Sequence, residues 1–191
     1  MLNTIRRHRP RPSAFRLLCG LVVVVLVSGP ASLANAQRGS ADAEMTRLMA
    51  RLSALSADSM EGRRAGTPGS QRARRWIIRE LTAIGAKPVG DSYEQFVKLP
   101  ARAGMDTSGA NILARIPGKR AGGAVIVVGA HYDHLGVRND QIYNGADDDA
   151  SGCVALLLMA ERLLASPPEH DVILAFFDNE EGGMHGSKTF V

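Results

Sequence analysis

Cysteine is the scarcest reactive residue in this sequence: the 191 residues contain Cys19 and Cys153 and no other cysteine. Cys19 lies in an N-terminal segment that we expect to be removed, which leaves Cys153 alone. A chain with a single cysteine forms no internal disulfide. Any metal site in this protein must therefore be built from histidine, aspartate and glutamate.

Several catalytic and ligand-binding motifs are also missing. There is no His-Glu-x-x-His pair, which excludes a thermolysin-like site, and no Gly-x-Ser-x-Gly elbow. "GGMHGSK" lacks the Gly-Lys-Ser/Thr core of a phosphate-binding loop, and the three aspartates at 147–149 lack EF-hand spacing. No basic patch interleaved with aromatic residues is present, so we expect no nucleic-acid partner.

Residues 1–36 have the layout of a secretory signal peptide. The basic stretch "IRRHRPRPSAFR" precedes the apolar run "LLCGLVVVVLV", and "ANA" precedes Gln37. The run of 11 apolar residues is shorter than the ~20 that a membrane span needs. We expect cleavage after Ala36, no stable membrane insertion afterwards, and a secreted or periplasmic protein; an uncleaved anchor is the alternative.

The positive charge of the chain comes from this N-terminal segment. The net charge is +4, and residues 1–36 hold five arginines and no acidic residue. Their removal leaves 18 lysine and arginine residues against 19 aspartate and glutamate residues, a net charge of −1. The basic character therefore belongs to the export signal and does not indicate a nucleic-acid partner.

Residues 37–191 predict one domain in which helices and strands alternate. Residues 37–43 indicate a loose start, and helical periods follow at 44–56 and at 70–85, the latter with Ser70 as N-cap and Gly85 as stop. Strands are expected at 92–99, 110–116, 124–130 and 171–177, and an apolar helix at 151–165. The run "AVIVVGA" is typical of a strand covered on both faces. The order strand, helix, strand favours an α/β layered fold.

Chemistry-bearing residues follow both apolar strands. "GAHYDHLG" places His131, Asp133 and His134 after the first strand, and "DNEE" places Glu180 and Glu181 after the second. Between them, "GADDDASG" puts three aspartates just before the apolar helix. Sites in such folds form at the carboxyl ends of the strands. If the two strands are neighbours, all three groups converge on one cleft.

Each group also has a purely structural interpretation. A histidine at a strand end is usually hydrogen-bonded into the fold, aspartates before a helix cap it, and paired glutamates often begin the next helix. Together, however, they bring many carboxylates to one cleft, where like charges repel. A divalent cation such as zinc would relieve that repulsion and suits histidine and carboxylate ligands.

The spacing within each group adds detail. Asp133 shares a strand face with His131, so it can support that histidine as a metal ligand needs. The middle aspartate, Asp148, could bridge two ions. Of the adjacent glutamates, one could bind metal while the other takes a proton from the attacking water, which two ions about 3.5–4 Å apart would activate.

The three motifs in this order resemble the family-28 metallopeptidases, the co-catalytic zinc aminopeptidases. The upstream stretches "MEGRRAGTPGSQRARRWIIRELTAIGAKP" and "GANILARIPG" also resemble that family, so the likeness extends from Glu44 to Val191. It implies a three-layer α/β sandwich with a mixed, mostly parallel central sheet flanked by helices. It also implies that residues 37–191 are the N-terminal part of a catalytic domain that acts on peptide or aminoacyl substrates.

The resemblance assigns roles to five residues. His131 resembles a ligand of one zinc ion, Asp148 the carboxylate that bridges two, and Glu181 a ligand of the other. Glu180 resembles the general base, and Asp133 the residue that orients His131. His134 is not a usual ligand of the family, and we expect it to be a supporting or cleft-wall histidine.

The sequence ends ten residues after Glu181, whereas the family's last two zinc ligands, an aspartate and a histidine, come later in the chain. We therefore expect a fold and a site that are incomplete at the C-terminus. Two alternatives to a two-zinc aminopeptidase remain: a non-catalytic relative with at most one weakly bound metal, and a single-zinc enzyme resembling glutaminyl cyclase. The preferred substrate and the oligomeric state are not predicted.

Overall fold

The computed structural model describes the backbone of residues 30–101, 104–120 and 122–191, and side chains from residue 41 onward. The chain divides into two compact units, residues 1–38 and 39–191. Of the first unit only residues 30–38 are described, and they form the start of helix α1 (Pro30–Leu55). Most of the predicted signal peptide thus lies outside the described residues, and its cleavage stays a prediction. No helix in the described ranges combines the length and the apolar character that a membrane crossing requires.

Helix α1 corrects one prediction. The loose start expected for residues 37–43 is helical, as part of α1. Farther along the helix, Arg51 pairs with Glu80 and Glu161 at 2.9 and 2.8 Å. Once a helix is nucleated and anchored, each further residue extends it at little cost. The small polar composition of 37–43 was therefore not a sufficient sign of a loop.

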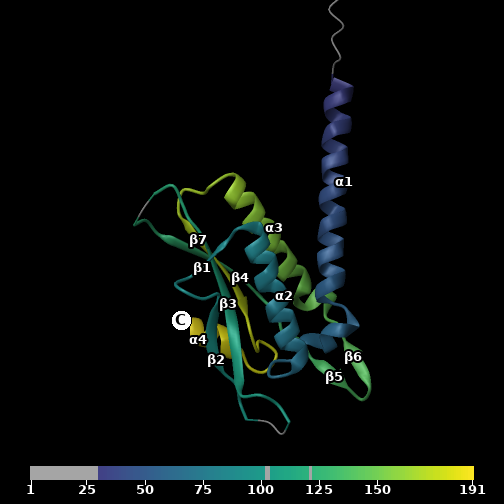
Figure 1. The fold of residues 1–191 in the computed structure, drawn as a ribbon, viewed down its shortest axis with the longest axis vertical. Coiled ribbons are helices and arrows are strands. Elements are labelled where there is room, and N and C mark those ends of the chain that lie inside the picture. Colours follow the sequence, from purple (N-terminus) through teal and green to yellow (C-terminus); the bar gives the residue numbers. More distant parts are fainter. Residues whose placement is uncertain (1–29, 102–103, 121) are drawn as a thin grey trace, which may run out of the picture. The chain divides into compact units, whose positions relative to one another are not determined.

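The central sheet is mixed, as predicted (Figure 1). It consists of β1 (Lys87–Pro88), β2 (Glu94–Lys98), β3 (Ser108–Ile116), β4 (Val125–His131) and β7 (Asp171–Phe177). The order is β1-β3-β7-β4, and β2 also pairs with β3. Only β4 and β7 are parallel, whereas β1–β3, β2–β3 and β3–β7 are antiparallel. The prediction that the sheet is mostly parallel is therefore wrong for the described part of the chain. Parallel neighbours require a crossover connection, and among the described strands a helix connects only β4 to β7 in this way.

Helices cover both faces of the sheet. Helices α2 (Pro68–Ile84) and α3 (Ser151–Ala165) pack on one face of the sheet and enclose the main core. Strand β7 contributes Leu174 and Phe176 to this core. The next residue of β7, Phe177, points to the opposite face and meets Phe190 of helix α4 (His185–Phe190), with ring centroids 5.7 Å apart. The three-layer arrangement of helix, sheet and helix is thus present.

The N-cap of helix α2 lies three residues earlier than expected. The cap is Thr67, whose Oγ1 accepts the N–H of Ser70 at 3.4 Å, so Ser70 is not the cap. Pro68 occupies the first turn, where its missing N–H costs nothing. At the other end Gly85 adopts a left-handed conformation with φ 90° and ends the helix as expected.

Strand β4 is present but less covered than predicted. Val125, Ile126 and Val127 are 52, 47 and 45% exposed. The strand is the last in the sheet order, with β7 on one side and no described strand on the other. The prediction that both faces of this strand are covered is therefore wrong for its first half, within the described part of the chain.

Candidate metal centre

Three segments meet at the carboxyl ends of β4 and β7. The parallel register places His131, the last residue of β4, beside Phe177, the last residue of β7. Between these strands in sequence, the short turn η2 (Ala146–Ala150) leads into α3 and carries the three aspartates. The strands are neighbours, as the sequence argument required, so the predicted histidine, aspartate and glutamate groups do converge.

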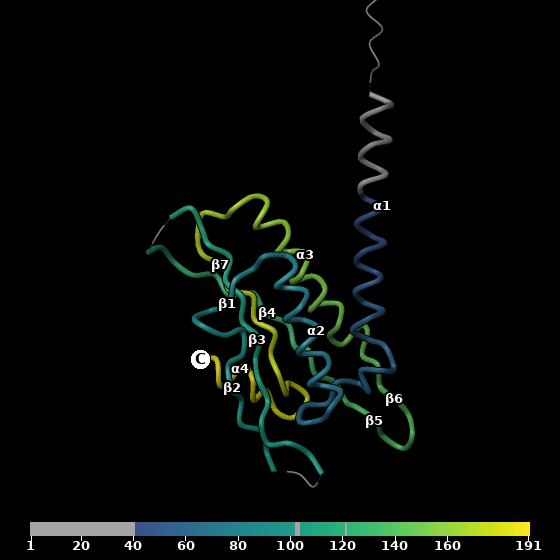
Figure 2. The backbone as a smooth tube through the Cα atoms, in the orientation of Figure 1, coloured from purple at the N-terminus to yellow at the C-terminus, as the bar shows by residue number. Residues whose placement is uncertain are grey.

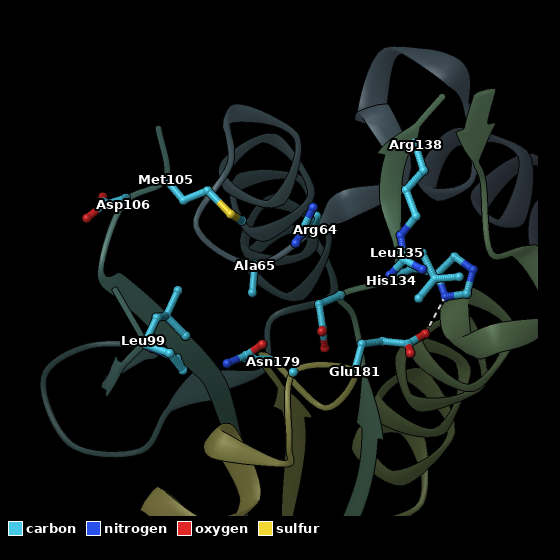
Figure 3. Close-up of a pocket in the computed structure, with 13 residues that line it drawn as sticks. Arg64, Ala65, Leu99, Met105, Asp106, His134, Leu135, Arg138, Asn179 and Glu181 are labelled. Carbon is cyan, nitrogen blue, oxygen red and sulfur yellow. Dashed lines mark hydrogen bonds and ion pairs between the residues drawn. The ribbon is translucent and has the colours of Figure 1, made fainter. Parts of the chain in front are cut away.

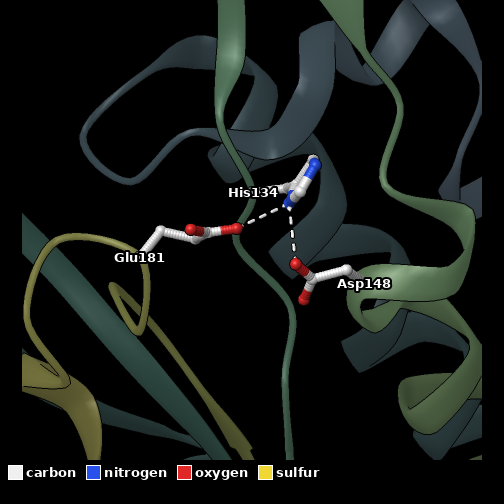
Figure 4. Close-up of side chains that lie close together, drawn as sticks. All are labelled: His134, Asp148 and Glu181. Carbon is white, nitrogen blue, oxygen red and sulfur yellow. Dashed lines mark hydrogen bonds and ion pairs between the residues drawn. The ribbon is translucent and has the colours of Figure 1, made fainter.

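The carboxylate of Asp148 lies between two histidines. Its Oδ1 is 3.0 Å from His131 Nε2, and its Oδ2 is 3.8 Å from His134 Nδ1. The same His134 nitrogen is 2.7 Å from Oε1 of Glu181 (Figure 4). The two oxygens of the Asp148 carboxylate therefore face different potential ligands: one faces His131, and the other faces His134, which is hydrogen-bonded to Glu181.

A cluster of three ligand atoms results. One atom each from His134, Asp148 and Glu181 lie within 4.8 Å of one another. His134 is buried, whereas Asp148 and Glu181 reach solvent. His134 is expected to be a supporting or cleft-wall histidine, and it does line the hollow beside the cluster. Its ring nitrogen also belongs to the cluster of potential ligands, and its position three residues after His131 is the signal in the sequence that points there.

His131 is fixed by the backbone of Asp133. Its Nδ1–H donates a hydrogen bond to the Asp133 carbonyl oxygen at 3.1 Å, which leaves Nε2 to face Asp148. Burial lowers the pKa of His131, but hydrogen bonding and the charge of Asp133 outweigh it and raise the pKa to about 9 in the metal-free protein. The ring is therefore held with its ligating nitrogen directed into the site.

The Asp133 carboxylate reaches the glutamate loop. It is almost fully buried, and its Oδ1 accepts the backbone N–H of Glu180 at 2.9 Å. The same oxygen is 3.7 Å from His131 Nδ1. Asp133 thus links the end of β4 to the loop after β7, which carries Glu180 and Glu181. Among the described residues, the Glu180 carboxylate itself makes no hydrogen bond or ion pair.

The three aspartates of η2 divide their roles. Asp149 accepts the backbone N–H of His131 at 3.2 Å and that of Gly152, in the first turn of α3, at 3.0 Å. The helix-capping interpretation therefore holds for Asp149. Asp148 instead turns toward the histidines, and Asp147 is exposed. The neighbours Asp148 and Asp149 thus serve different purposes.

A hollow opens beside the cluster (Figure 3). His134 and Glu181 form part of its wall, Leu99 and Met105 supply apolar surface, and Arg64 and Arg138 supply positive charge. A ligand in this hollow would therefore contact the cluster directly.

The residues present fit zinc. Two ligands of a tetrahedral zinc ion, each about 2.0–2.1 Å from it, lie about 3.3 Å apart, close to the 3.0 Å between His131 Nε2 and Asp148 Oδ1. The donors are imidazole nitrogen and carboxylate oxygen. Burial raises the pKa of the Cys153 thiol, which donates to the His131 carbonyl at 3.3 Å. Cys153 is therefore a packing residue and supplies no thiolate.

Comparison with known proteins agrees with this chemistry. Residues 111–191 match the sequence profile of peptidase family M28. A "probable zinc metalloprotease" of Pyrenophora tritici-repentis is 31% identical over 135 residues, which are 64% of this chain and 27% of that protein. Leucine aminopeptidase 1 of Grosmannia clavigera is 36% identical over 87 residues, 41% of this chain and 21% of that protein. The chain thus spans about a quarter of the length of these curated relatives.

Solved structures share the fold. A zinc-dependent exopeptidase from Parabacteroides distasonis superposes with a TM-score of 0.55 and 25% identity, covering 70% of this chain and 46% of that chain. Glutaminyl cyclase from Tannerella forsythia gives a TM-score of 0.54 and 24% identity, covering 69% of this chain and 45% of that chain. The second likeness, at its low identity, concerns the fold alone.

Proposed function

We propose, from the match of residues 111–191 to peptidase family M28, that the complete protein is an exported, zinc-dependent exopeptidase of the aminopeptidase type. The observation that carries the proposal is the Asp148 carboxylate, which has one oxygen at His131 and the other toward His134 and Glu181. A carboxylate that faces two ligand groups is suited to bridge two metal ions.

His131, Asp148 and Glu181 would hold the metal, with His134 beside Glu181. Zinc bound there would act as a Lewis acid on the substrate carbonyl and would activate a water molecule for attack. Asp133 would keep the His131 ring oriented through the carbonyl contact to Nδ1. Two ions rather than one are part of the proposal, because the two oxygens of Asp148 face separate groups.

Glu180 is the proposed general base. Its backbone N–H is fixed by the buried Asp133 carboxylate, while its own carboxylate makes no hydrogen bond or ion pair within the described part of the chain. It is therefore available to accept a proton from the attacking water and to pass that proton to the leaving amine. The neighbouring Glu181 is engaged by His134, so the two glutamates are placed for different tasks.

The substrate would be a peptide or an aminoacyl compound, as the family implies. The hollow lined by Leu99, Met105 and the two arginines borders His134 and Glu181, so a peptide could lie there with its scissile carbonyl at the cluster. Export, to the periplasm or to the medium, rests on the signal-peptide layout of residues 1–36.

The decisive test is Glu180→Gln in the full-length chain. We expect aminoacyl-substrate hydrolysis to fall about 10²–10⁴-fold, the usual contribution of general base catalysis, while bound zinc, measured by atomic absorption, is unchanged. Glu169→Gln changes an exposed glutamate whose one ion pair among the described residues is with Arg120 at 3.8 Å; it is the matched control and should retain activity. Undiminished turnover by the Glu180 variant would refute the assigned base.

A single-zinc cyclase is the second candidate. The observation in its favour is that, within the described residues, one cluster of three or more potential ligands is found. Such an enzyme would convert N-terminal glutamine to pyroglutamate and release ammonia. One zinc ion per chain together with ammonia release would favour it, whereas two zinc ions and free amino acid release would favour the peptidase. A full-length protein with neither activity and weak metal binding would indicate a non-catalytic relative.

A further inference from the structure

Arg63 is the largest fully buried side chain of the described residues, and the proposed chemistry makes no use of it. It ends the short helix η1 (Asp58–Arg63), where Glu61, Gly62 and Arg63 all adopt positive φ angles of 49, 61 and 52°. Such a conformation costs on the order of 1–3 kcal/mol for a non-glycine residue. A buried guanidinium in a strained backbone therefore needs strong compensating interactions.

The guanidinium donates to four backbone carbonyls. Its Nε donates to Tyr132 at 2.8 Å, and its Nη2 donates to Gly145 at 2.8 Å. Its Nη1 donates to Leu55 at 2.9 Å and to Asn144 at 2.5 Å. These carbonyls belong to three segments that are far apart in sequence. The planar, five-donor guanidinium can join them, whereas a lysine ammonium with three donors cannot reproduce that geometry.

Two of those segments carry the candidate metal ligands. Tyr132 lies between His131 and Asp133 in sequence, at the end of β4. Asn144 and Gly145 immediately precede the turn that presents Asp148. Gly145 packs so closely that a Cβ there would lie 2.5 Å from His134 Cδ2. Arg63 therefore joins the histidine segment to the aspartate segment directly beneath the cluster.

The charge of Arg63 also suits this position. Burial lowers its pKa, the negative charges of Asp133, Asp148 and Asp149 oppose that effect, and an arginine stays protonated in proteins. The guanidinium thus places a permanent positive charge near carboxylates that would otherwise repel one another before a metal binds.

We propose that Arg63 is a positioning residue of the metal centre, which holds the ends of the histidine and aspartate segments in place through the Tyr132, Asn144 and Gly145 carbonyls. The inference rests on the proposed zinc function. Ligands already held at the right separation lose less conformational freedom when the metal binds. Arg63 would therefore raise zinc affinity beyond its contribution to the stability of the fold.

The test compares Arg63→Lys with Arg51→Lys in the full-length chain. Arg51 is an arginine that is 15% exposed; its partners are Glu80 and Glu161, and it makes no hydrogen bond or ion pair with a candidate ligand among the described residues. Zinc dissociation constants are measured by chelator competition, the visible absorption of bound Co²⁺ reports the ligand geometry, and urea unfolding reports stability. We expect R63K to raise the zinc dissociation constant about 10–100-fold, as loss of a supporting contact does, and to alter the Co²⁺ spectrum. R51K should lose stability while keeping the wild-type constant within about twofold.

Each other result overturns a defined part of the proposal. R63K with wild-type zinc affinity would show that Arg63 stabilises the fold and nothing more. A wild-type protein without zinc affinity would overturn the metal centre and, with it, the role of Arg63. If R63K does not fold in buffer, the same three proteins are compared in trimethylamine N-oxide, which favours the folded state, and the same criteria apply.

Discussion

Asp178 is the most deeply buried carboxyl group near the candidate centre. It is 0% exposed, its Oδ2 accepts the backbone N–H of Ala110 at 3.0 Å, and its Oδ1 has no hydrogen-bond partner among the described residues. Burial, followed by repulsion from Asp133, raises its pKa to about 6. The fold therefore keeps a carboxyl group that resists ionisation three residues before Glu181.

Replacement of Asp178 by asparagine should change how stability depends on pH. The folded protein binds this proton more tightly than the unfolded chain, whose carboxyl has the usual pKa of 3.8, so stability is lost as pH rises from about 4 to about 6. We expect D178N to remove that loss, worth roughly 2–3 kcal/mol at most, and to be the more stable protein at pH 7. Urea unfolding of both proteins between pH 4 and 8 measures this. Parallel stability curves would show that Asp178 ionises normally.

At the level of single residues, the three sequence motifs were enough to predict which side chains come together. His131, Asp133, Asp148, Glu180 and Glu181 do lie on the converging segments; their catalytic and metal-binding roles stay predictions. The buried carbonyl contacts of Arg63 could not be predicted, because they depend on segments 8 to 82 residues away. Arg63 also stands next to Arg64, which has the same side chain and lines the hollow.

At the level of elements, regular patterns predicted regular structure. Helix α3 and strand β7 have the bounds that their apolar runs indicated. The two-stranded hairpin of β5 (Gly136–Arg138) and β6 (Gln141–Tyr143) was not predicted, because each strand has three residues and no clear alternation. It lies outside the main sheet, next to η1 (Figure 2). Helix α4 was likewise too short to give a period.

Strand β4 leads to a prediction about association. An apolar edge strand without a neighbour favours pairing with other chains. Val127→Lys adds charge at a residue that is already 45% exposed, so it should cost little stability. We expect purified protein of this sequence to self-associate and V127K to shift its sedimentation toward the monomer at equal concentration. Val137→Lys, at a valine 46% exposed on the β5–β6 hairpin, is the control. Equal effects of both variants would show that added charge, rather than the edge of β4, is responsible.

At the level of the whole molecule, the parallel pairing of β4 with β7 determines where the site forms. His131 ends one strand, Glu180 and Glu181 follow the other, and α3 begins between them at the Asp148 turn. The order of motifs was enough to predict this convergence, because a strand–helix–strand unit brings two carboxyl ends to the same edge. The antiparallel majority of the sheet was not predictable from that unit, since it comes from β1, β2 and β3, which precede it.

Metal binding should stabilise the whole domain, because the candidate ligands His131, Asp148 and Glu181 come from three different segments of the chain. A ligand that binds only the folded state adds about 2.7 kcal/mol at a concentration of 100 times its dissociation constant. For a domain of this size, 1 kcal/mol corresponds to about 2–4 °C, so zinc should raise the thermal midpoint by roughly 5–10 °C over protein treated with a chelator. Asp148→Asn should abolish most of that rise, and because Asp148 is exposed it should leave the metal-free midpoint nearly unchanged. Asp147→Asn, at the exposed neighbour, should respond to zinc as the wild type does. A zinc-induced rise that survives in D148N would mean that the ion binds elsewhere, and the bridging role of this carboxylate would then be wrong.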